Sequence, residues 1–171
     1  MALGYIENHP SGPIEIWYSA QKEVLRLQNG RVVGAVGLTT EWRNVQLAGL
    51  QPWSEYVLLG HAAHLVRHRD VMPGYRFGIK DELTLQAIDP PSKHALSGID
   101  ARSLTWFEER IDRAAYDDKL GPDQSLPPAK YAVDLQGGKE TVVYGEQCLT
   151  EMLCFTWQRW PVHTQNLSTQ R

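Results

Sequence analysis

The sequence lacks the long apolar runs that cross membranes and the basic excess that binds polyanions. No stretch approaches the roughly 20 apolar residues of a transmembrane helix. The opening segment, MALGYIENHPSGP, has no basic stretch followed by an apolar one, so no signal peptide is expected. The net charge of −3 argues against nucleic acid as a partner. Two locations remain open: the cytoplasm, or the periplasm for a mature domain without its export segment.

Cysteine is scarce, with only Cys148 and Cys154 in the chain. In one continuous strand their Cα atoms would lie about 20 Å apart, and in a helix they would lie on different faces. A disulfide needs Cα atoms within about 7 Å and therefore a tight turn between the two residues. The intervening residues, LTEML, include no glycine or proline. We therefore expect two thiols packed as small apolar side chains, which leave the redox compartment undecided.

The familiar catalytic motifs are also missing. The chain has no G-x-S-x-G elbow, no G-x-x-x-x-G-K-[ST] phosphate loop and no H-E-x-x-H pair. His68-Arg69-Asp70 matches the start of the kinase catalytic loop, but the position that requires asparagine is Gly74. We predict no catalytic residue and no cofactor.

Three histidines, His61, His64 and His68, lie close together in the sequence. On a helix they would share one face, but on the strand that we favour only His64 and His68 do. Those two would then lie about 13 Å apart, too far for one metal ion. No metal site is predicted, and these are expected to be exposed or partly buried strand residues.

A group of carboxylates could suggest acid–base chemistry, but adjacent residues of a strand point to opposite faces. We expect a solvated face, partly neutralised by arginines. The carboxylates are Glu108, Glu109, Asp112, Asp117 and Asp118, and the arginines are Arg102, Arg110 and Arg113.

The strongest positive signal is Asn29-Gly30, which lies between two runs of β-forming residues. A type I′ turn needs positive φ at both central residues, and Asn-Gly supplies it. The pair predicts a hairpin between strands 24–28 and 31–37, preceded by a strand at 14–19. Alternation in the middle strand places Leu25 and Leu27 on one face.

Short β-rich runs with turn signals continue through the chain, which predicts a mainly β fold, either an antiparallel sandwich or a partly open barrel of short hairpin strands.

Residues 39–51 are ambiguous between strand and a short helix ended by Pro52, and 103–116 has a helical alternative to strand 104–111. We expect a flexible lead-in at 1–13, one domain at 14–161 with an exposed loop at 117–128, and a mobile tail at 162–171. The remaining predicted strands are 53–59, 62–69, 75–80, 83–88, 131–135, 140–144 and 148–160.

Six tryptophans and seven tyrosines are scattered along the chain, and most should be core residues of a β protein. A minority is expected to serve a binding surface, because aromatic rings stack on sugar faces and provide rigid contact area. The preferred candidates for ligand or partner binding lie next to loops: Trp42, Arg43, Tyr75 and Arg76.

Several motifs, in this order, resemble the YjbF/GfcB family of bacterial lipoproteins, which is associated with group 4 capsule and exopolysaccharide production. The resemblance spans about residues 16 to 147. It rests on Trp17-Tyr18-Ser19, Leu25 through Asn29-Gly30-Arg31-Val32-Val33, Val36-Gly37-Leu38, Pro73-Gly74-Tyr75-Arg76-Phe77-Gly78, Tyr131-Ala132-Val133-Asp134 and Gly137-Gly138.

The resemblance implies a mainly β fold, a periplasmic location and a non-enzymatic role in polysaccharide export, with a polysaccharide or an export-machinery protein as partner. It supplies no catalytic residue. Members are anchored by a lipidated cysteine, and this chain has none near its start. Any outer-membrane anchor would therefore lie outside it.

Two other functions remain open from the sequence. One is a small β-barrel that holds a lipid or another small molecule in an internal cavity. The other is an enzyme that acts on polysaccharide, which requires two carboxylates facing each other across a groove.

Overall fold

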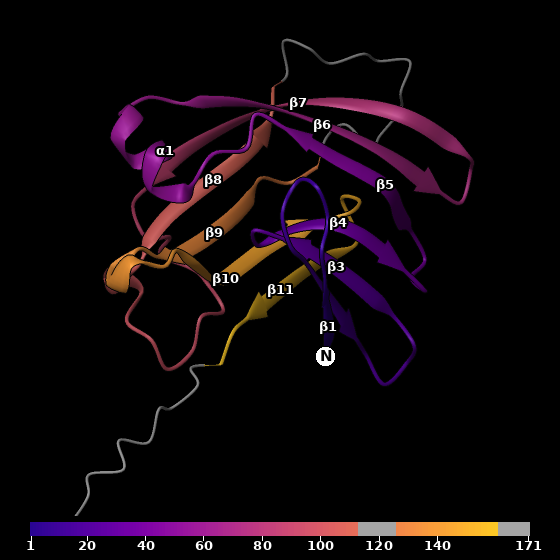
Figure 1. Cartoon of the computed structure of the whole chain (residues 1–171), viewed down its shortest axis with the longest axis horizontal. Helices are drawn as coiled ribbons and strands as arrows, with labels where there is room; N and C mark the ends of the chain where they lie inside the picture. The colour runs from indigo at the N-terminus through magenta and orange to yellow at the C-terminus, as the bar shows by residue number, and fades with distance from the viewer. Residues whose placement is uncertain (113–125, 161–171) are drawn as a thin grey trace, which may run out of the picture.

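The computed structural model describes residues 1–112 and 126–160, which form one antiparallel sheet of eleven strands. The strands follow one another in sequence order without a crossover, and the sheet curls into a half-barrel (Figure 1). The predicted mainly β, partly open barrel is confirmed. The strands are β1 (Ala2–Glu7), β2 (Ile14–Tyr18), β3 (Val24–Gln28), β4 (Arg31–Val36), β5 (Glu41–Ala48), β6 (Ala63–Met72), β7 (Arg76–Ile88), β8 (Thr105–Ile111), β9 (Ala129–Asp134), β10 (Thr141–Cys148) and β11 (Cys154–Gln158).

The Asn29-Gly30 hairpin forms as predicted. Both residues have positive φ, 48° and 81°, as a type I′ turn requires. Gly30 is needed for a second reason, because a Cβ atom there would lie 2.7 Å from the side chain of Val142 on β10. The turn between β3 and β4 therefore packs directly against β10, across the curl of the sheet.

The predicted flexible lead-in at 1–13 is wrong in its first half. Residues Ala2–Glu7 form β1, which pairs with β2 from Ala2 opposite Tyr18 to Glu7 opposite Ile14. Apart from Gly4, which lies in β1, the glycine and prolines of this segment lie in the turn that follows, where Gly12 donates its N–H to the carbonyl of His9. The predicted tail at 162–171 and most of the predicted loop at 117–128 lie outside the described residues.

The strand predicted at 53–59 is wrong, because these residues form the helix α1 (Trp53–Leu59). Pro52 precedes the first turn, and Gly60 ends the helix in the left-handed conformation at φ 65°. Trp53 and Tyr56, three residues apart, share the buried side, as a helix requires. The sequence analysis predicts that Pro52 ends a helix, whereas in the structure Pro52 precedes the first residue of one.

A carboxylate from another part of the chain caps α1. Glu140, just before β10, accepts hydrogen bonds from the backbone N–H groups of Trp53 at 2.6 Å and Ser54 at 2.9 Å. Burial by itself raises the pKa of Glu140, but the bonds from Ser54 and Trp53 outweigh it and hold that pKa below its usual value. The helix is thus fixed to the sheet at its first turn.

The ambiguous segments resolve as strands. Residues 41–48 form β5, which pairs with β4 at one position, Ala35 opposite Trp42, and with β6 along most of its length. A bulge at Asn44, with φ 49°, interrupts the pairing with β6. The separately predicted strands 75–80 and 83–88 belong to one long strand, β7, and 104–111 is strand β8 rather than helix.

The two ends of the sheet pack on each other. Leu25 and Leu27 of β3 lie in one buried cluster with Leu149, and Phe155 and Trp157 of β11 pack against it. Arg159, just after β11, binds both carboxylate oxygens of Glu15 on β2. The curl therefore encloses a core between the first and the last strands.

The prediction that Cys148 and Cys154 are free thiols is wrong. They lie opposite each other at the ends of β10 and β11, with Cα atoms 3.9 Å apart, and they form a disulfide. The turn needs neither glycine nor proline, because the Thr150 hydroxyl accepts hydrogen bonds from the N–H groups of Met152 and Leu153. The two strands meet at this turn, so the distance expected for one continuous strand does not apply.

Reduction of this disulfide is expected to lower the free energy of unfolding by about 2 kcal/mol, the loop-closure term for the six-residue separation of the two cysteines. Urea unfolding with and without dithiothreitol measures the change. The double variant Cys148→Ser/Cys154→Ser is the control, because its stability should be the same in both conditions. Equal stability of the oxidised and reduced wild-type protein would contradict the prediction.

Candidate functional site

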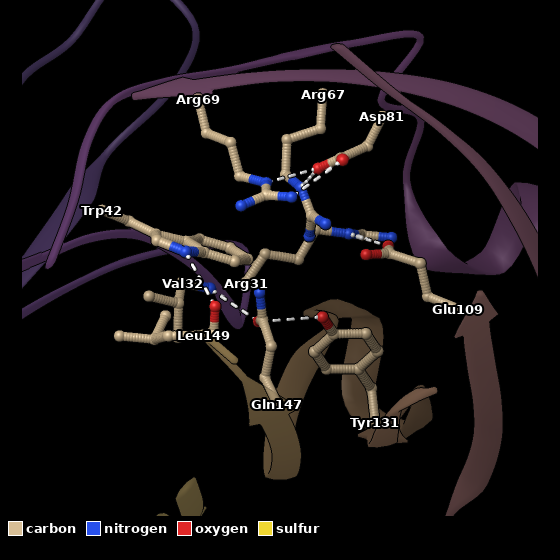
Figure 2. A network of polar contacts seen from close by, with 10 residues as sticks. All are labelled: Arg31, Val32, Trp42, Arg67, Arg69, Asp81, Glu109, Tyr131, Gln147 and Leu149. Carbon is tan, nitrogen blue, oxygen red and sulfur yellow. Dashed lines mark hydrogen bonds and ion pairs between the residues drawn. The ribbon is translucent and has the colours of Figure 1, made fainter. Parts of the chain in front are cut away.

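Inside the curl lies a buried network of ion pairs drawn from four strands (Figure 2). Arg31 on β4 contacts Glu109 on β8 at 2.7 Å. Arg67 and Arg69 on β6 both contact Oδ2 of Asp81 on β7, each at 2.7 Å. All five side chains are buried, which makes this the most unusual feature of the interior.

Aromatic rings complete the surroundings of these arginines. The guanidinium carbons of Arg67 and Arg69 lie 4.6 Å and 4.8 Å from the ring centre of Trp42, within the range of cation–π attraction. The guanidinium of Arg31 lies 4.2 Å from the ring of Trp53 and 5.3 Å from that of Tyr131. The faces of the rings thus replace part of the water that a guanidinium would otherwise bind.

Gln147 on β10 connects this network to the backbone. Its side-chain oxygen accepts hydrogen bonds from the N–H of Val32 at 2.9 Å and from the hydroxyl of Tyr131 at 3.1 Å. The Trp42 indole donates to the carbonyl of Leu149 at 3.2 Å. These contacts tie β10 to β4, β5 and β9, so the network helps to close the curl.

The charges of the network are paired with one another in the way that stabilises a fold. Burial raises the pKa of Asp81, but the charges and hydrogen bonds of Arg67 and Arg69 outweigh it and hold that pKa below its usual value. Burial and the charge of Glu109 raise the pKa of Tyr131, which keeps its hydroxyl protonated as a donor. Asp81 and Glu109 are therefore arginine-bound carboxylates rather than an exchanging acid–base pair.

The predicted solvated carboxylate face is wrong for Glu108 and Glu109, which are both buried. Glu109 faces the interior and Arg31, while Glu108 contacts Arg110 at 2.5 Å. The partner of Glu109 lies 78 residues earlier in the chain, so inspection of neighbouring charges could not find it. A pocket of ≈10 Å³ beside Arg67, Glu109 and Gln147 has the size of about one water molecule.

A second candidate site lies on the surface, at the turn between β6 and β7. Tyr75 and Phe77 are 76% and 64% exposed, and their ring centres lie 6.4 Å apart. Tyr75 has φ 54°, an unfavourable conformation for a bulky residue and one often found at binding sites. Two aromatic rings thus stand together in solvent. They belong to the end of the hairpin formed by the long strands β6 and β7, whose path Figure 1 shows.

A groove of ≈450 Å³ runs from Tyr75 to the turn before β5. Its polar wall is Arg43, which contacts Glu41 at 2.6 Å. Asp70 holds the base of the hairpin, because its two oxygens accept from the Asn44 amide and the Gly78 N–H. The groove is lined by Leu38, Thr39, Glu41, Arg43, Met72, Pro73 and Tyr75.

The structure divides the four predicted binding residues. Arg43 and Tyr75 line the same groove, whereas the Trp42 ring is completely buried against Arg67 and Arg69. Arg76 is half-buried at the start of β7. Sequence analysis missed Phe77, because Tyr75 has positive φ in the turn and no strand alternation links the two residues.

The histidines are exposed, as expected. His64 and His68 lie on the outer face of β6, opposite the inward-facing Leu65 and Arg67, and His61 precedes the strand. Among residues 1–112 and 126–160, no three metal-binding side chains converge.

Comparison with known proteins supports the fold. No protein-family profile and no curated protein sequence matches the chain. The structure is similar to the crystal structure of the hypothetical lipoprotein YmcC from Escherichia coli K12, with a TM-score of 0.58 and 18% identity, over 91% of this chain and 78% of that one. At this identity the likeness shows a shared fold. Over the described residues, no helix is long and apolar enough to traverse a bilayer.

Proposed function

We propose that this protein is a non-enzymatic accessory protein of exopolysaccharide or capsule production in the bacterial periplasm, which binds polysaccharide or an export-machinery protein. The fold shared with a lipoprotein and the motifs that resemble the YjbF/GfcB family support this proposal. The Cys148–Cys154 disulfide also supports it, because such bonds persist in oxidising compartments.

The observation that carries the binding role is the exposed pair of Tyr75 and Phe77, of which Tyr75 lines the groove. The two rings, tilted by 49° to each other, provide apolar faces of the kind that pack on the C–H faces of sugar rings, and Arg43 adds a charged donor. Such a surface fits a polysaccharide chain better than a compact ligand, because the groove is open and shallow rather than enclosed.

The two alternative functions have less support. An enzyme that hydrolyses polysaccharide needs two free carboxylates on either side of a groove, but the buried carboxylates of the interior are bound to arginines. A ligand-binding barrel needs a central cavity, but Trp53, Phe107, Tyr131 and the arginines fill the centre of the curl. A pocket of ≈770 Å³ lies apart from this centre, lined by residues of β2 to β5 that include Ile14, Val33 and Leu47.

Replacement of the two exposed rings is expected to weaken polysaccharide binding at least tenfold. The variants are Tyr75→Gly, which suits φ 54° and so keeps the fold, and Phe77→Ala. Calorimetric titration with purified bacterial exopolysaccharides measures the affinity. Leu58→Ala is the matched control, because Leu58 is an apolar residue, 84% exposed, on α1 at the other end of β6.

The outcome distinguishes the two classes of partner. Binding of exopolysaccharide by the wild-type protein, lost in Tyr75→Gly and retained in Leu58→Ala, supports the proposal. Binding that both Tyr75→Gly and Phe77→Ala leave unchanged contradicts the assignment of the site. Failure to bind any exopolysaccharide, with capture of an export protein that depends on Tyr75, would assign the surface to the protein partner instead.

A further inference from the structure

The edge strand β1 carries apolar side chains that no described part of the chain covers. Leu3, Tyr5 and Ile6 are 44%, 53% and 56% exposed, and the exposed Tyr18 on β2 lies beside them over Gly4. β1 pairs with β2 on one side, and within the described residues no strand pairs with its other side. A row of backbone N–H and C=O groups therefore faces solvent beside an apolar surface.

This edge has one of the devices that protect edge strands, a bulge at Gly4, but lacks the others. In native sheets, lysine, proline or inward-pointing charges prevent an exposed edge strand from pairing with another chain. Residues Ala2–Glu7, ALGYIE, contain no lysine, arginine or proline. The single charge is Glu7, and Arg26 on β3 neutralises it at 2.8 Å. The strand is thus compatible with pairing to another extended chain.

We infer that β1 is the interface of a homodimer, in which two copies pair their β1 strands antiparallel about a two-fold axis. The sequence of the strand is complementary to itself in this arrangement. A bulge at Gly4 separates Leu3, opposite Trp17, from Tyr5, opposite Ile16, and so places Leu3 and Ile6 on the same face. With the axis between Gly4 and Tyr5, Leu3 then meets Ile6 of the partner subunit, and these apolar pairs form twice.

The charges agree with this register. Each Glu7 lies opposite Ala2 of the partner subunit, so the two carboxylates are at opposite ends of the interface and do not repel each other. Each Glu7 also keeps its ion pair with Arg26 of its own chain. The result is a continuous sheet across two molecules, with self-complementary contacts, as two-fold symmetry requires.

Sedimentation equilibrium between about 1 and 200 µM tests the inference, because a short strand pairing is expected to give a micromolar dissociation constant. Ile6→Lys is expected to weaken the dimer at least tenfold, and Leu3→Lys is a second variant with the same expectation. Leu58→Lys on α1 is the control and should dimerise like the wild-type protein. Circular dichroism checks that each variant is folded.

Amide hydrogen exchange provides an independent measurement. The β1 amides of the wild-type protein should exchange more slowly at 200 µM than at 1 µM, and those of folded Ile6→Lys should not. A monomer at every concentration would overturn the inference. So would a dimer that both β1 variants leave intact, because another surface would then hold it. Neither result would affect the binding role proposed for Tyr75 and Phe77.

Discussion

Replacement of Asp81 by asparagine is expected to lower the free energy of unfolding by about 3–5 kcal/mol, the cost of removing one partner from a buried ion pair. Asp81 is almost completely buried and contacts both Arg67 and Arg69 at 2.7 Å. The variant leaves two guanidinium groups in the interior without this counter-charge. Urea unfolding followed by circular dichroism measures the change.

The loss should depend on pH in a defined direction. The pKa of Asp81 is lowered in the folded protein, so its stabilising contribution is complete above the unfolded pKa of about 3.9 and disappears as the pH falls through the folded value. The wild-type protein and Asp81→Asn should therefore differ fully at pH 7 and converge below about pH 4. A difference that stays constant down to pH 2 would show that the charge is not responsible.

Glu82→Gln is the matched control for Asp81→Asn. Glu82 is the next residue of β7, is 45% exposed at its side chain and contacts Lys80 at the surface at 2.7 Å. An exposed pair of this kind contributes about 1 kcal/mol or less. If Asp81→Asn costs no more than Glu82→Gln, the buried network does not stabilise the fold in the way described.

Replacement of Trp53 by alanine should lower the free energy of unfolding by about 3–5 kcal/mol, through the cavity that it leaves. The Trp53 ring packs against Phe107 and Tyr131, with centre distances of 4.9 Å and 5.3 Å, and against Arg31. Its indole N–H also donates to the side chain of Asn29 in the β3–β4 turn at 2.9 Å. Thermal and urea unfolding measure the effect.

Trp160→Ala removes the same side chain from an exposed position and is expected to change stability by less than about 0.5 kcal/mol. Both variants lose one indole, so the difference between their free energies of unfolding measures the effect of burying that side chain. If Trp53→Ala lowers the free energy of unfolding no more than Trp160→Ala does, the packing of α1 does not depend on Trp53.

Local signals explain which parts of the fold the sequence predicts. Asn29-Gly30 specifies its hairpin through backbone conformations that few other pairs adopt, and Pro73-Gly74 marks the turn between β6 and β7. The strand prediction for 53–59 failed because the side chains of a short apolar run suit either structure. The helix is stabilised by its cap, Glu140, which lies 87 residues away from Trp53 in the sequence.

The same limit applies to the candidate sites. Arg43 and Tyr75 were found because they flank turns, and the fold brings them to one groove. Trp42 occupies an inward position of the same strand as Arg43, and only its pairing register with Val71 reveals that it faces the arginines. The disulfide was missed because a threonine side chain made a turn that is usually made by glycine.

The sequential order of the strands also determines how the chain can fold. Each strand pairs with its neighbour in sequence, so most pairings close a short loop and each adds to a ladder that already exists. The contact between Arg159 and Glu15 is different, because it joins residues 144 positions apart. The ladder can therefore assemble from the amino end as the chain is made, while the docking of its last strand on its first strands is a separate, late event.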